Sequence, residues 1–481
     1  MTRIKIVLWA ALFTAMLVSC GDPLHVPEGD LPLIKENEFY AQNMKTGKFY
    51  IVGADPLYEG SNCVVWAERG SGITRDKAKE IADEYDNKIR PTVVNAFSYK
   101  EFEVDYETTK FQFEDMLDFA NWLVDGDDGR LTILLLDIKD GFNPPKIESY
   151  VAGYFYGGNF NPQGKIKGTV HYSNGRDMIY VDTNPGLQDD PKHDYTTQAY
   201  ATFAHELQHL INFATTVLMR WDGKYYHYMD TWIDEGLSSQ AEHLYAGKNL
   251  FGKYDWFNKD GKETIAKGNN FFVWDNHREE PDAILDDYAT VYLFFRWLYL
   301  QASLKSSSNI FLKIETSNHY DYHAVIDVAK QINPAWDNWE TLLRTWLAAN
   351  YYPNSSYGYV NGAELQTIKV NPIAGSTISL YPGEGVYSII KPSFSAGTSG
   401  NIHYAGLTET TINPSSPYTE KVLLTFNANT NNSNKEWSET GRLTGVTPPP
   451  KSQTMAKNIQ TETITGPYVI DARDMLERSK R

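Results

Sequence analysis

Residues 204–212 read Ala-His-Glu-Leu-Gln-His-Leu-Ile-Asn, and this stretch places two histidines four positions apart. Small and apolar residues recur around the pair at helical spacing, which predicts a buried helix over residues 195 to about 219. Residues four apart share one face of a helix, with Cβ atoms ~5–6 Å apart. His205 and His209 can therefore both reach one Zn²⁺ ion through bonds of ~2.0–2.1 Å. Glu206 lies one position further round, where it can take a proton from a water on the ion.

A zinc site of this kind needs a third protein ligand, because His-Glu-x-x-His also arises by chance in helices. The extended motif, which continues with a glycine and a third histidine, is not met, since Asn212 and Thr215 stand at those positions. A glutamate is the other solution, and Glu235 follows His209 by 26 positions. It stands near the start of a second expected helix, residues 232–245, whose small residues would let it pack closely against the first. We therefore predict that Glu235 completes the zinc site.

The chain before these two helices alternates strand and helix patterns, and the chain after them becomes helical. The expected strands are Cys63 to Ala67, Leu131 to Ile138, Tyr150 to Tyr156 and Met178 to Asp182, and the expected helices are Arg75 to Ile89, Thr108 to Val124 and Asp287 to Leu304. After about residue 355, short alternating runs take over at residues 377–380, 385–391 and 421–426. Such runs are typical of a β-sandwich. The fold class that follows is α+β, with a C-terminal β-sandwich domain.

The first twenty residues have the form of a bacterial lipoprotein signal peptide. Arg3 and Lys5 precede an apolar run, residues 6–18, that is short for a membrane span. The run leads into Leu-Val-Ser-Cys at residues 17–20, which looks like a lipobox and predicts cleavage before Cys20 and lipid on that residue. An ordinary signal peptide that contains a cysteine is the alternative. We expect the mature chain at the bacterial cell envelope, anchored through Cys20 and either periplasmic or surface-exposed.

The composition is that of a globular protein with an acidic surface. A net charge of −17, from 44 basic and 61 acidic residues, argues against binding to nucleic acid or to anionic lipid, since both need basic surface. We therefore expect membrane contact only through the lipid on Cys20. The second cysteine, Cys63, lies in an apolar run and has no partner once Cys20 is acylated. It is predicted to be a buried core thiol and not a nucleophile.

A cluster of aspartates precedes one of the expected strands. Asp125, Asp127 and Asp128 surround two glycines, Gly126 and Gly129, and suggest a Ca²⁺ site. The order of a calcium-binding loop is not met, because the third aspartate comes one residue early. A plain helix-to-strand turn is the other interpretation.

At 481 residues the chain exceeds one ordinary hydrophobic core, so two or more domains are expected. The predicted division is a signal peptide at 1–20, a polar tether at 21–45, a catalytic domain at 46–355 with an α/β part (46–193) and a helical part (194–355), a β-sandwich at 356–447 and a tail at 448–481.

The string Trp-x-x-Glu-Gly at residues 232–236, with a second glutamate seven positions after Glu235 at Glu242, resembles the gluzincin zinc peptidases, including the aminopeptidase N group. The hyicolysin-type secreted bacterial metallopeptidases are a closer match. They share a His-Glu-x-Gln-His-x-Ile-Asn-like helix, the Glu-Gly-x-Ser segment and an upstream Asp-Gly-rich turn that leads into an Ile/Leu strand. The resemblance covers about residues 60–300 and does not extend to the β-rich C-terminal part.

The resemblance implies a thermolysin-like catalytic domain, in which a mixed sheet lies above two zinc-binding helices and its edge strand binds extended peptide by strand addition. Met178 to Asp182 is the candidate for that edge strand, and an ordinary interior strand is the alternative. The resemblance also implies a tyrosine that stabilises the transition state. Tyr288 matches that position, although Val291 replaces the usual glycine, and His227 and Tyr228 are rival donors.

Together these features predict a lipid-anchored zinc peptidase with protein or peptide substrates, an endopeptidase in preference to an aminopeptidase. The predicted metal ligands are His205, His209 and Glu235, and the predicted catalytic residues are Glu206 and Tyr288. Glu242 either orients a ligand histidine or lies on a solvated helix face. The alternative function is a binding or adhesion lipoprotein on a catalytically idle peptidase scaffold.

Overall fold

The computed structural model divides the chain into two compact units. Unit 1 comprises Met1–Asp230, Leu237–Phe251 and Ile464–Arg481, and unit 2 comprises Thr231–Gly236 and Gly252–Thr463. The residues that the structure describes are 31–97, 130–143, 150–160, 164–166, 169–188, 195–218, 228–249, 252–258, 271–272, 283–368, 370–372, 377–380, 382–390, 393–395, 400–430 and 439–442. Helix α5 (Thr231–Ala246) runs unbroken from residues of unit 2 into residues of unit 1.

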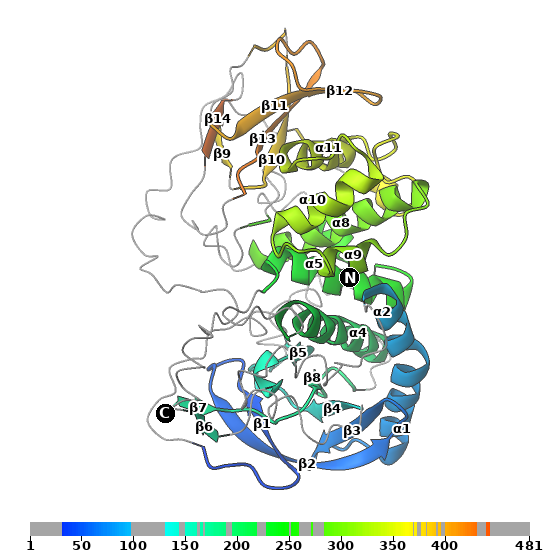
Figure 1. The fold of residues 1–481 in the computed structure, drawn as a ribbon, viewed down its shortest axis with the longest axis vertical. Helices are drawn as coiled ribbons and strands as arrows, with labels where there is room; N and C mark the ends of the chain where they lie inside the picture. The colour runs from blue at the N-terminus through cyan, green and yellow to red at the C-terminus, as the bar shows by residue number, and fades with distance from the viewer. Residues whose placement is uncertain are drawn as a thin grey trace, which may run out of the picture. The chain divides into compact units, whose positions relative to one another are not determined.

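A six-stranded mixed sheet forms the centre of unit 1, with the strand order β1-β2-β3-β4-β8-β5 (Figure 1). The strands are β1 (Glu38–Gln42), β2 (Phe49–Glu59), β3 (Cys63–Glu68), β4 (Leu131–Leu136), β5 (Gly153–Phe155) and β8 (Met178–Asp182). Strands β3, β4 and β8 are parallel neighbours, whereas β1, β2 and β5 each run antiparallel to the strand beside them. Every residue of β4 and β8 is buried, as expected of central strands in a parallel region. Strand β6 (Gly164–Ile166) pairs antiparallel with β7 (Thr169–His171) in a separate two-stranded sheet.

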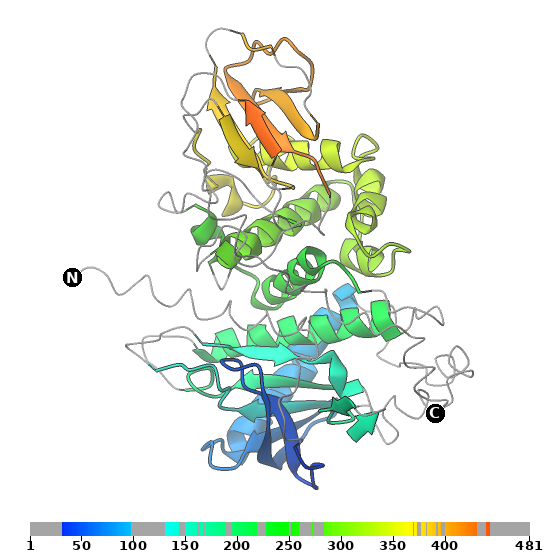
Figure 2. The ribbon, with the colours of Figure 1, turned by 90° about the vertical axis from the view of Figure 1, so that its left-hand side faces the viewer.

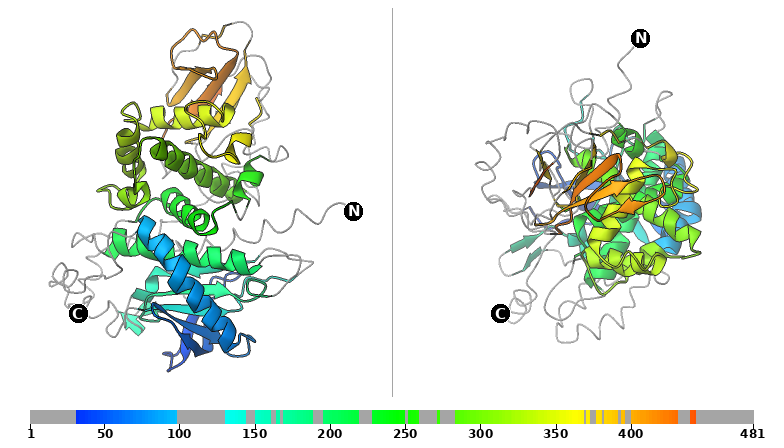
Figure 3. Two further views of the ribbon diagram at one scale, coloured as in Figure 1. Left: turned by 90° about the vertical axis from the view of Figure 1, so that its right-hand side faces the viewer. Right: turned by 90° about the horizontal axis from the view of Figure 1, so that it is seen from above.

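Helices pack on this sheet and position the His-Glu-x-x-His segment. They are α1 (Arg75–Glu84), the π-helical turn η3 (Tyr85–Ile89), α2 (Arg90–Phe97), the 3₁₀ turn η4 (Gly157–Phe160), α4 (Tyr195–Phe213) and the π-helical turn η5 (Ala214–Leu218). Thr74 begins α1 by accepting a hydrogen bond from the Lys77 N–H. Helix α1 packs on β2 and β3, α4 packs on β5 and β8, and α2 and η3 contact α4 (Figure 3). The helix with both histidines therefore lies directly on the last two strands of the sheet.

The edge of the sheet next to α4 is β5, and this corrects one expectation. Met178 to Asp182 was the candidate edge strand, but it is β8, an interior strand paired with β4 on one side and β5 on the other. The shorter Gly153–Phe155 strand lies at the end of the sheet beyond β8, and β1 lies at the other end. At Gly153 the backbone approaches α4 closely, because a Cβ there would lie 2.8 Å from both the Thr202 methyl carbon and the Tyr180 carbonyl oxygen. A glycine is therefore what brings this edge strand against the helix.

Unit 2 combines helices with antiparallel strands (Figure 2). The elements that follow α5 are α6 (Lys253–Phe257), α8 (Ala283–Leu304), α9 (Ile310–Glu315), α10 (Tyr322–Ile332), α11 (Trp339–Tyr351), the 3₁₀ turn η6 (Leu365–Thr367), β9 (Thr377–Leu380), β10 (Gly385–Ile389), β11 (Ile402–Leu407), β12 (Ile412–Asn413), β13 (Val422–Asn427) and β14 (Glu439–Arg442). One sheet has the order β10-β13-β11-β12, and β14 pairs with β9 in a second. Buried residues of these strands and their connections form a hydrophobic cluster that includes Leu380, Phe394 and Leu423.

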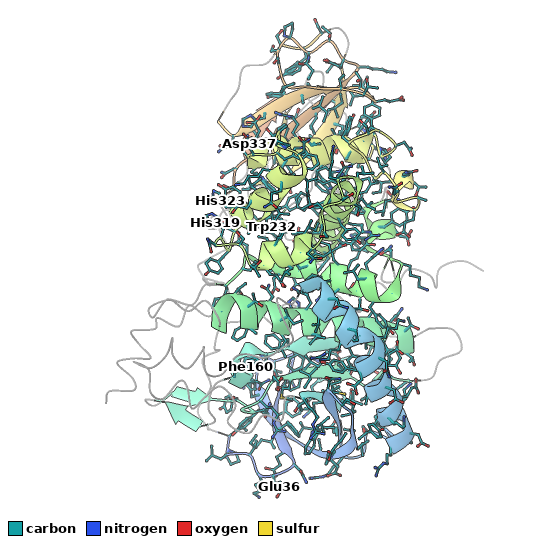
Figure 4. The ribbon with its side chains drawn as sticks, turned by 45° about the vertical axis from the view of Figure 1, so that its right-hand side comes forward. Glu36, Phe160, Trp232, His319, His323 and Asp337 are labelled. Atoms are coloured by element: carbon teal, nitrogen blue, oxygen red, sulfur yellow. The ribbon has the colours of Figure 1, made fainter. Side chains whose placement is uncertain are left out.

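Trp232 lies at the centre of an aromatic core in unit 2 (Figure 4). Its ring contacts five other aromatic rings at centroid distances of 5.3–5.9 Å: Phe271, Phe272, Phe294, Phe295 and Trp339. Aromatic pairs in this range add roughly 0.5–1.5 kcal/mol each beyond their buried area. The first turn of α5 is thus held by packing, and Glu235 stands three residues further along the same helix.

The α+β fold with a mixed sheet is confirmed, and unit 2 contains a further sheet, which is antiparallel. Strand β1 lies inside the stretch assigned to the tether and is mostly buried, so the folded part begins before residue 46. The proposed boundary at residue 355 falls within unit 2. The predicted helix Thr108 to Val124 and the Asp125 to Gly129 turn, with its candidate Ca²⁺ site, lie outside the described residues.

Cys63 is fully buried at the start of β3, and burial raises the pKa of its thiol, which confirms a core thiol in place of a nucleophile. Among the helices that the structure describes, none combines the length and the hydropathy needed to cross a bilayer.

Candidate metal centre

The two histidines of α4 lie side by side in the interior of the protein. His205 and His209 are 1% and 2% exposed, and their ring centroids are 4.6 Å apart. Their Nε2 atoms face each other at 2.9 Å. Burial of two imidazoles with their ring nitrogens turned together is costly unless these polar atoms have a suitable partner.

The other ring nitrogen of His205 meets a carboxylate. His205 Nδ1 lies 2.6 Å from Oε1 of Glu242, which is on α5 and is also buried. The carboxylate oxygen accepts, so the Nδ1–H donates and the lone pair of the neutral ring stays on Nε2. The predicted orienting contact of Glu242 with a ligand histidine is present, and the solvated-face alternative is excluded because Glu242 is buried.

The other ring nitrogen of His209 meets a hydroxyl. The Ser238 hydroxyl donates to Oε1 of Gln208, an atom that can only accept. With its proton used in that bond, the Ser238 oxygen accepts from His209 Nδ1 at 3.1 Å. His209 therefore also carries its proton on Nδ1 and its lone pair on Nε2. Gln208 and Ser238 thus set the tautomer of one histidine, and Glu242 sets that of the other.

The chemistry of these groups fits a divalent metal ion. Two Nε2 lone pairs that face each other repel, and a cation placed against both converts this repulsion into two bonds. Their 2.9 Å separation is close to the ~3.3 Å expected between two ligands of a tetrahedral ion with bonds of ~2.0–2.1 Å. Glu235 supplies the third group, since its carboxylate oxygen and the two ring nitrogens all lie within 4.8 Å of one another. Two imidazoles and a carboxylate are a ligand set that zinc uses in catalytic sites.

Helix α5 places Glu235 by packing on both sides of that residue. Trp232 anchors the preceding turn, and Gly236 lies so close to α8 that a Cβ there would stand 2.2 Å from the Phe295 ring. Gly236 therefore approaches α8, whereas Ser238 is the small residue that contacts α4. The Trp-x-x-Glu-Gly string has a physical meaning here, because the residues around the ligand hold its helix in position.

Glu206 and Tyr288, the predicted catalytic residues, are both buried. Glu206 is 1% exposed, and its Cγ would lie 3.5 Å from a Cβ built on Gly153, so it sits beside the edge strand β5. Tyr288 is 1% exposed and belongs to α8. Of its rivals, Tyr228 is half-buried with its ring 6.1 Å from that of Phe213, and His227 is outside the described residues. The roles of Glu206 and Tyr288 remain predictions.

Gln208 and Ser238 were not predicted to orient a histidine, although both belong to the two segments shared with the bacterial metallopeptidases. The available signal was their place in the two motif segments, next to His209 and three positions after Glu235. The spacing of residues along the chain does not show that the Ser238 hydroxyl on α5 contacts both the Gln208 amide and the His209 ring on α4.

We expect Ser238→Ala and Glu242→Gln each to weaken zinc binding by roughly 10–100-fold, since each loosens the orientation and tautomer of one histidine. Titration with buffered zinc measures the dissociation constants. Ser303→Ala is the matched control, because that exposed hydroxyl bonds the Tyr299 carbonyl on α8. Equal zinc affinity in Ser238→Ala and wild type would remove the orienting role of the hydroxyl.

His205, His209 and Glu235 thus form a candidate metal site, with the His-His-Glu ligand set that catalytic zinc sites of metallopeptidases use. The chain is 32% identical over 278 residues to the neutral metalloprotease ShpI of Staphylococcus hyicus, and the match covers 57% of this chain and 53% of that protein. The chain therefore spans about half the length of the curated relative it matches. No family model matches the chain. The resemblance to hyicolysin-type secreted bacterial metallopeptidases is confirmed by this similarity.

Proposed function

We propose that this protein is a zinc-dependent peptidase that hydrolyses peptide bonds in protein substrates. The observation that carries the proposal is the convergence of His205, His209 and Glu235, whose ligand atoms lie within 4.8 Å of one another. The similarity to a neutral metalloprotease supports the same activity. The two histidines carry their protons on Nδ1, which leaves both Nε2 atoms ready to bind the ion.

The chemistry divides between the ion and the chain. Zinc, when bound by these three residues, supplies a Lewis acid that polarises the scissile carbonyl and acidifies a water molecule. Glu206 is the general base: its carboxylate takes a proton from the attacking water and later gives that proton to the leaving amine. Its burial keeps bulk water away from this transfer and strengthens its electrostatic effect on the reacting groups.

The substrate is proposed to bind along the edge of the mixed sheet, as in a thermolysin-like arrangement. Strand β5 is the terminal described strand on the side of the sheet next to α4, and a peptide added to it would form main-chain hydrogen bonds. Gly153 of β5 lies beside Glu206, so a peptide on this edge would run past the general base. A strand-binding edge suits an extended chain with residues on both sides of the cleaved bond, and this favours an endopeptidase.

Tyr288 is proposed to donate a hydrogen bond to the oxyanion that forms on the attacked carbonyl. Tyr288→Phe is expected to lower kcat by about 10²–10³-fold and to leave the zinc content unchanged, because the phenol acts on the transition state only. Steady-state kinetics and metal analysis of the variant measure the two effects. Tyr292→Phe, on the next turn of α8, is the control. An unchanged kcat in Tyr288→Phe would transfer the role to another donor.

Anchoring to the cell envelope through lipid on Cys20 is proposed from the first twenty residues alone, where an apolar run ends in Leu-Val-Ser-Cys. We expect wild-type protein in the membrane fraction and Cys20→Ala in the soluble fraction or unprocessed, as measured by fractionation and mass spectrometry of the N-terminus. A Cys20→Ala variant that is processed and membrane-bound like wild type would rule out this anchor.

One experiment separates a peptidase from an idle scaffold that only binds partners. Purified protein is analysed for metal and then incubated with a generic protein substrate, with chelator, and with zinc added back. A peptidase holds about one zinc ion per chain, loses activity to the chelator and regains it with zinc. Zinc-loaded protein that cleaves no substrate would support the idle scaffold that only binds partners. Protein that holds no zinc would contradict the proposed zinc site itself.

A further inference from the structure

Three metal-binding side chains also meet at the surface of unit 2, around the start of α10. His319, Asp321 and His323 each offer one ligand atom, and these atoms lie within 4.8 Å of one another. Figure 4 shows His319 and His323 together on the outside of the protein. Their side chains are 50% and 48% exposed, so an ion in solution has direct access. Neither the proposed peptidase mechanism nor the His-His-Glu centre uses these residues.

His323 and Asp321 are already held close together at the start of α10. The Asp321 carboxylate caps α10 by accepting from the His323 N–H. The same carboxylate lies 2.9 Å and 3.1 Å from His323 Nδ1 through its two oxygens. The ring of Tyr322 lies 3.9 Å from the His323 ring and also contacts Trp339 of the aromatic core. Two of the three ligands are therefore preorganised by a helix cap and by packing.

His319 comes from the connection between α9 and α10. Its backbone N–H donates to the Ser317 hydroxyl, which fixes the turn, and its ring lies 5.2 Å from the His323 ring. Its Nε2 atom is 3.7 Å from a carboxylate oxygen of Asp327, which also binds Lys330. A second carboxylate, paired with the Lys330 ammonium, thus lies beside the cluster. Asp321, at the N-cap, offsets the positive end of the α10 dipole, which by itself would disfavour a cation.

We propose that His319, Asp321 and His323 form a second metal site, which binds a divalent transition-metal ion such as Zn²⁺. Imidazole is a ligand for zinc, nickel and copper, whereas calcium and magnesium take oxygen ligands, so two histidines select the transition metals. Two ligand atoms bound to one ion through bonds of ~2.0–2.1 Å lie at most ~4 Å apart. The three ligand atoms lie within 4.8 Å of one another, so rotations of the exposed side chains that move these atoms by less than ~1 Å would bring them to bonding distance. A bound ion would tie the α9–α10 connection to the first turn of α10.

The test counts zinc on the whole protein after its first equivalent is bound. Equilibrium dialysis against rising zinc, with metal measured by atomic emission, is expected to give a second equivalent in wild type. The double variant His319→Ala/His323→Ala is expected to raise the dissociation constant of that second equivalent by at least about 10-fold. Asn318→Ala, an exposed change in the same turn, is the matched control and should bind as wild type does. Single His319→Gln provides the same comparison with a smaller disturbance.

Each outcome of the zinc titration either supports or overturns the second metal site. Loss of the second equivalent in the histidine variants, with the first equivalent and the circular dichroism spectrum retained, supports the site. A second equivalent that the double variant keeps at wild-type affinity places that ion elsewhere and overturns the proposal. A wild-type protein that stops at one equivalent overturns it too. Calcium is expected not to compete, and displacement of the second zinc ion by equal calcium would contradict imidazole ligation.

Discussion

Glu206→Gln is expected to reduce peptide hydrolysis by about 10²–10⁴-fold and to leave the zinc content at one ion per chain. Glutamine has nearly the shape of glutamate but cannot take a proton from water. Glu206 is not one of the three grouped ligands, so the ion should stay in place. The two readouts are kcat/KM on a protein substrate and zinc per chain by atomic emission.

The environment of Glu206 makes this variant a clean test. The side chain is 1% exposed and its Cγ lies beside Gly153 of the edge strand, and glutamine keeps nearly the same volume there. The stability of the fold should therefore change little. Glu36→Gln, the same substitution at an exposed position, is the control for effects of charge alone (Figure 4). Near-normal turnover in Glu206→Gln would require a different base.

Local patterns predicted the parts of the fold on which the site depends. The helix that carries both histidines was expected over residues 195 to about 219, and the structure has α4 at Tyr195–Phe213 followed by the turn Ala214–Leu218. The second helix was expected at 232–245 and is α5 at Thr231–Ala246. Both patterns are long and strongly periodic, and such segments are the most reliably recognised.

One helix extends further than its sequence pattern predicts, and a proline explains the difference. The helix expected at Arg75 to Ile89 continues through α2 to Phe97. Pro91 has no N–H and disfavours helix at the residue before it, so the pattern ends there when only local rules are applied. In the structure the π-helical turn η3 stands directly before Arg90 and Pro91. A widened turn next to a proline absorbs the missing hydrogen bond, and the helix continues.

The order of strands was beyond local reasoning. Met178 to Asp182 and Tyr150 to Tyr156 were both recognised as strands, but pattern alone does not say which of two neighbours is at the edge. The five buried residues of β8 are consistent with a central strand, and Gly153 marks the close approach of β5 to α4. The residues that orient His209 were missed for a similar reason, because Gln208 and Ser238 meet only after two helices pack.

Glu235→Gln is expected to weaken zinc binding by at least about 100-fold and to abolish activity at zinc concentrations that saturate wild type. Loss of an anionic ligand leaves two neutral imidazoles, and the effect should exceed the 10–100-fold typical of residues that only orient a ligand. Asp234→Asn removes the same charge one position earlier in α5 and should retain zinc, which makes it the matched control. Zinc titration and kcat/KM provide the readouts.

The thermal stability of wild type and Glu235→Gln, compared with and without zinc, provides an independent test of this prediction. Zinc that binds only the folded state stabilises it by mass action, so wild type should gain thermal stability from zinc and Glu235→Gln should gain little. Without metal the order is expected to reverse or vanish, because Glu235 is 1% exposed and glutamine removes a charge that is costly to bury. A general loss of folding would instead lower the unfolding midpoint with and without zinc alike. If Glu235→Gln bound zinc as tightly as wild type, the third ligand would have to be another residue, since the two imidazoles of α4 alone do not complete a zinc site.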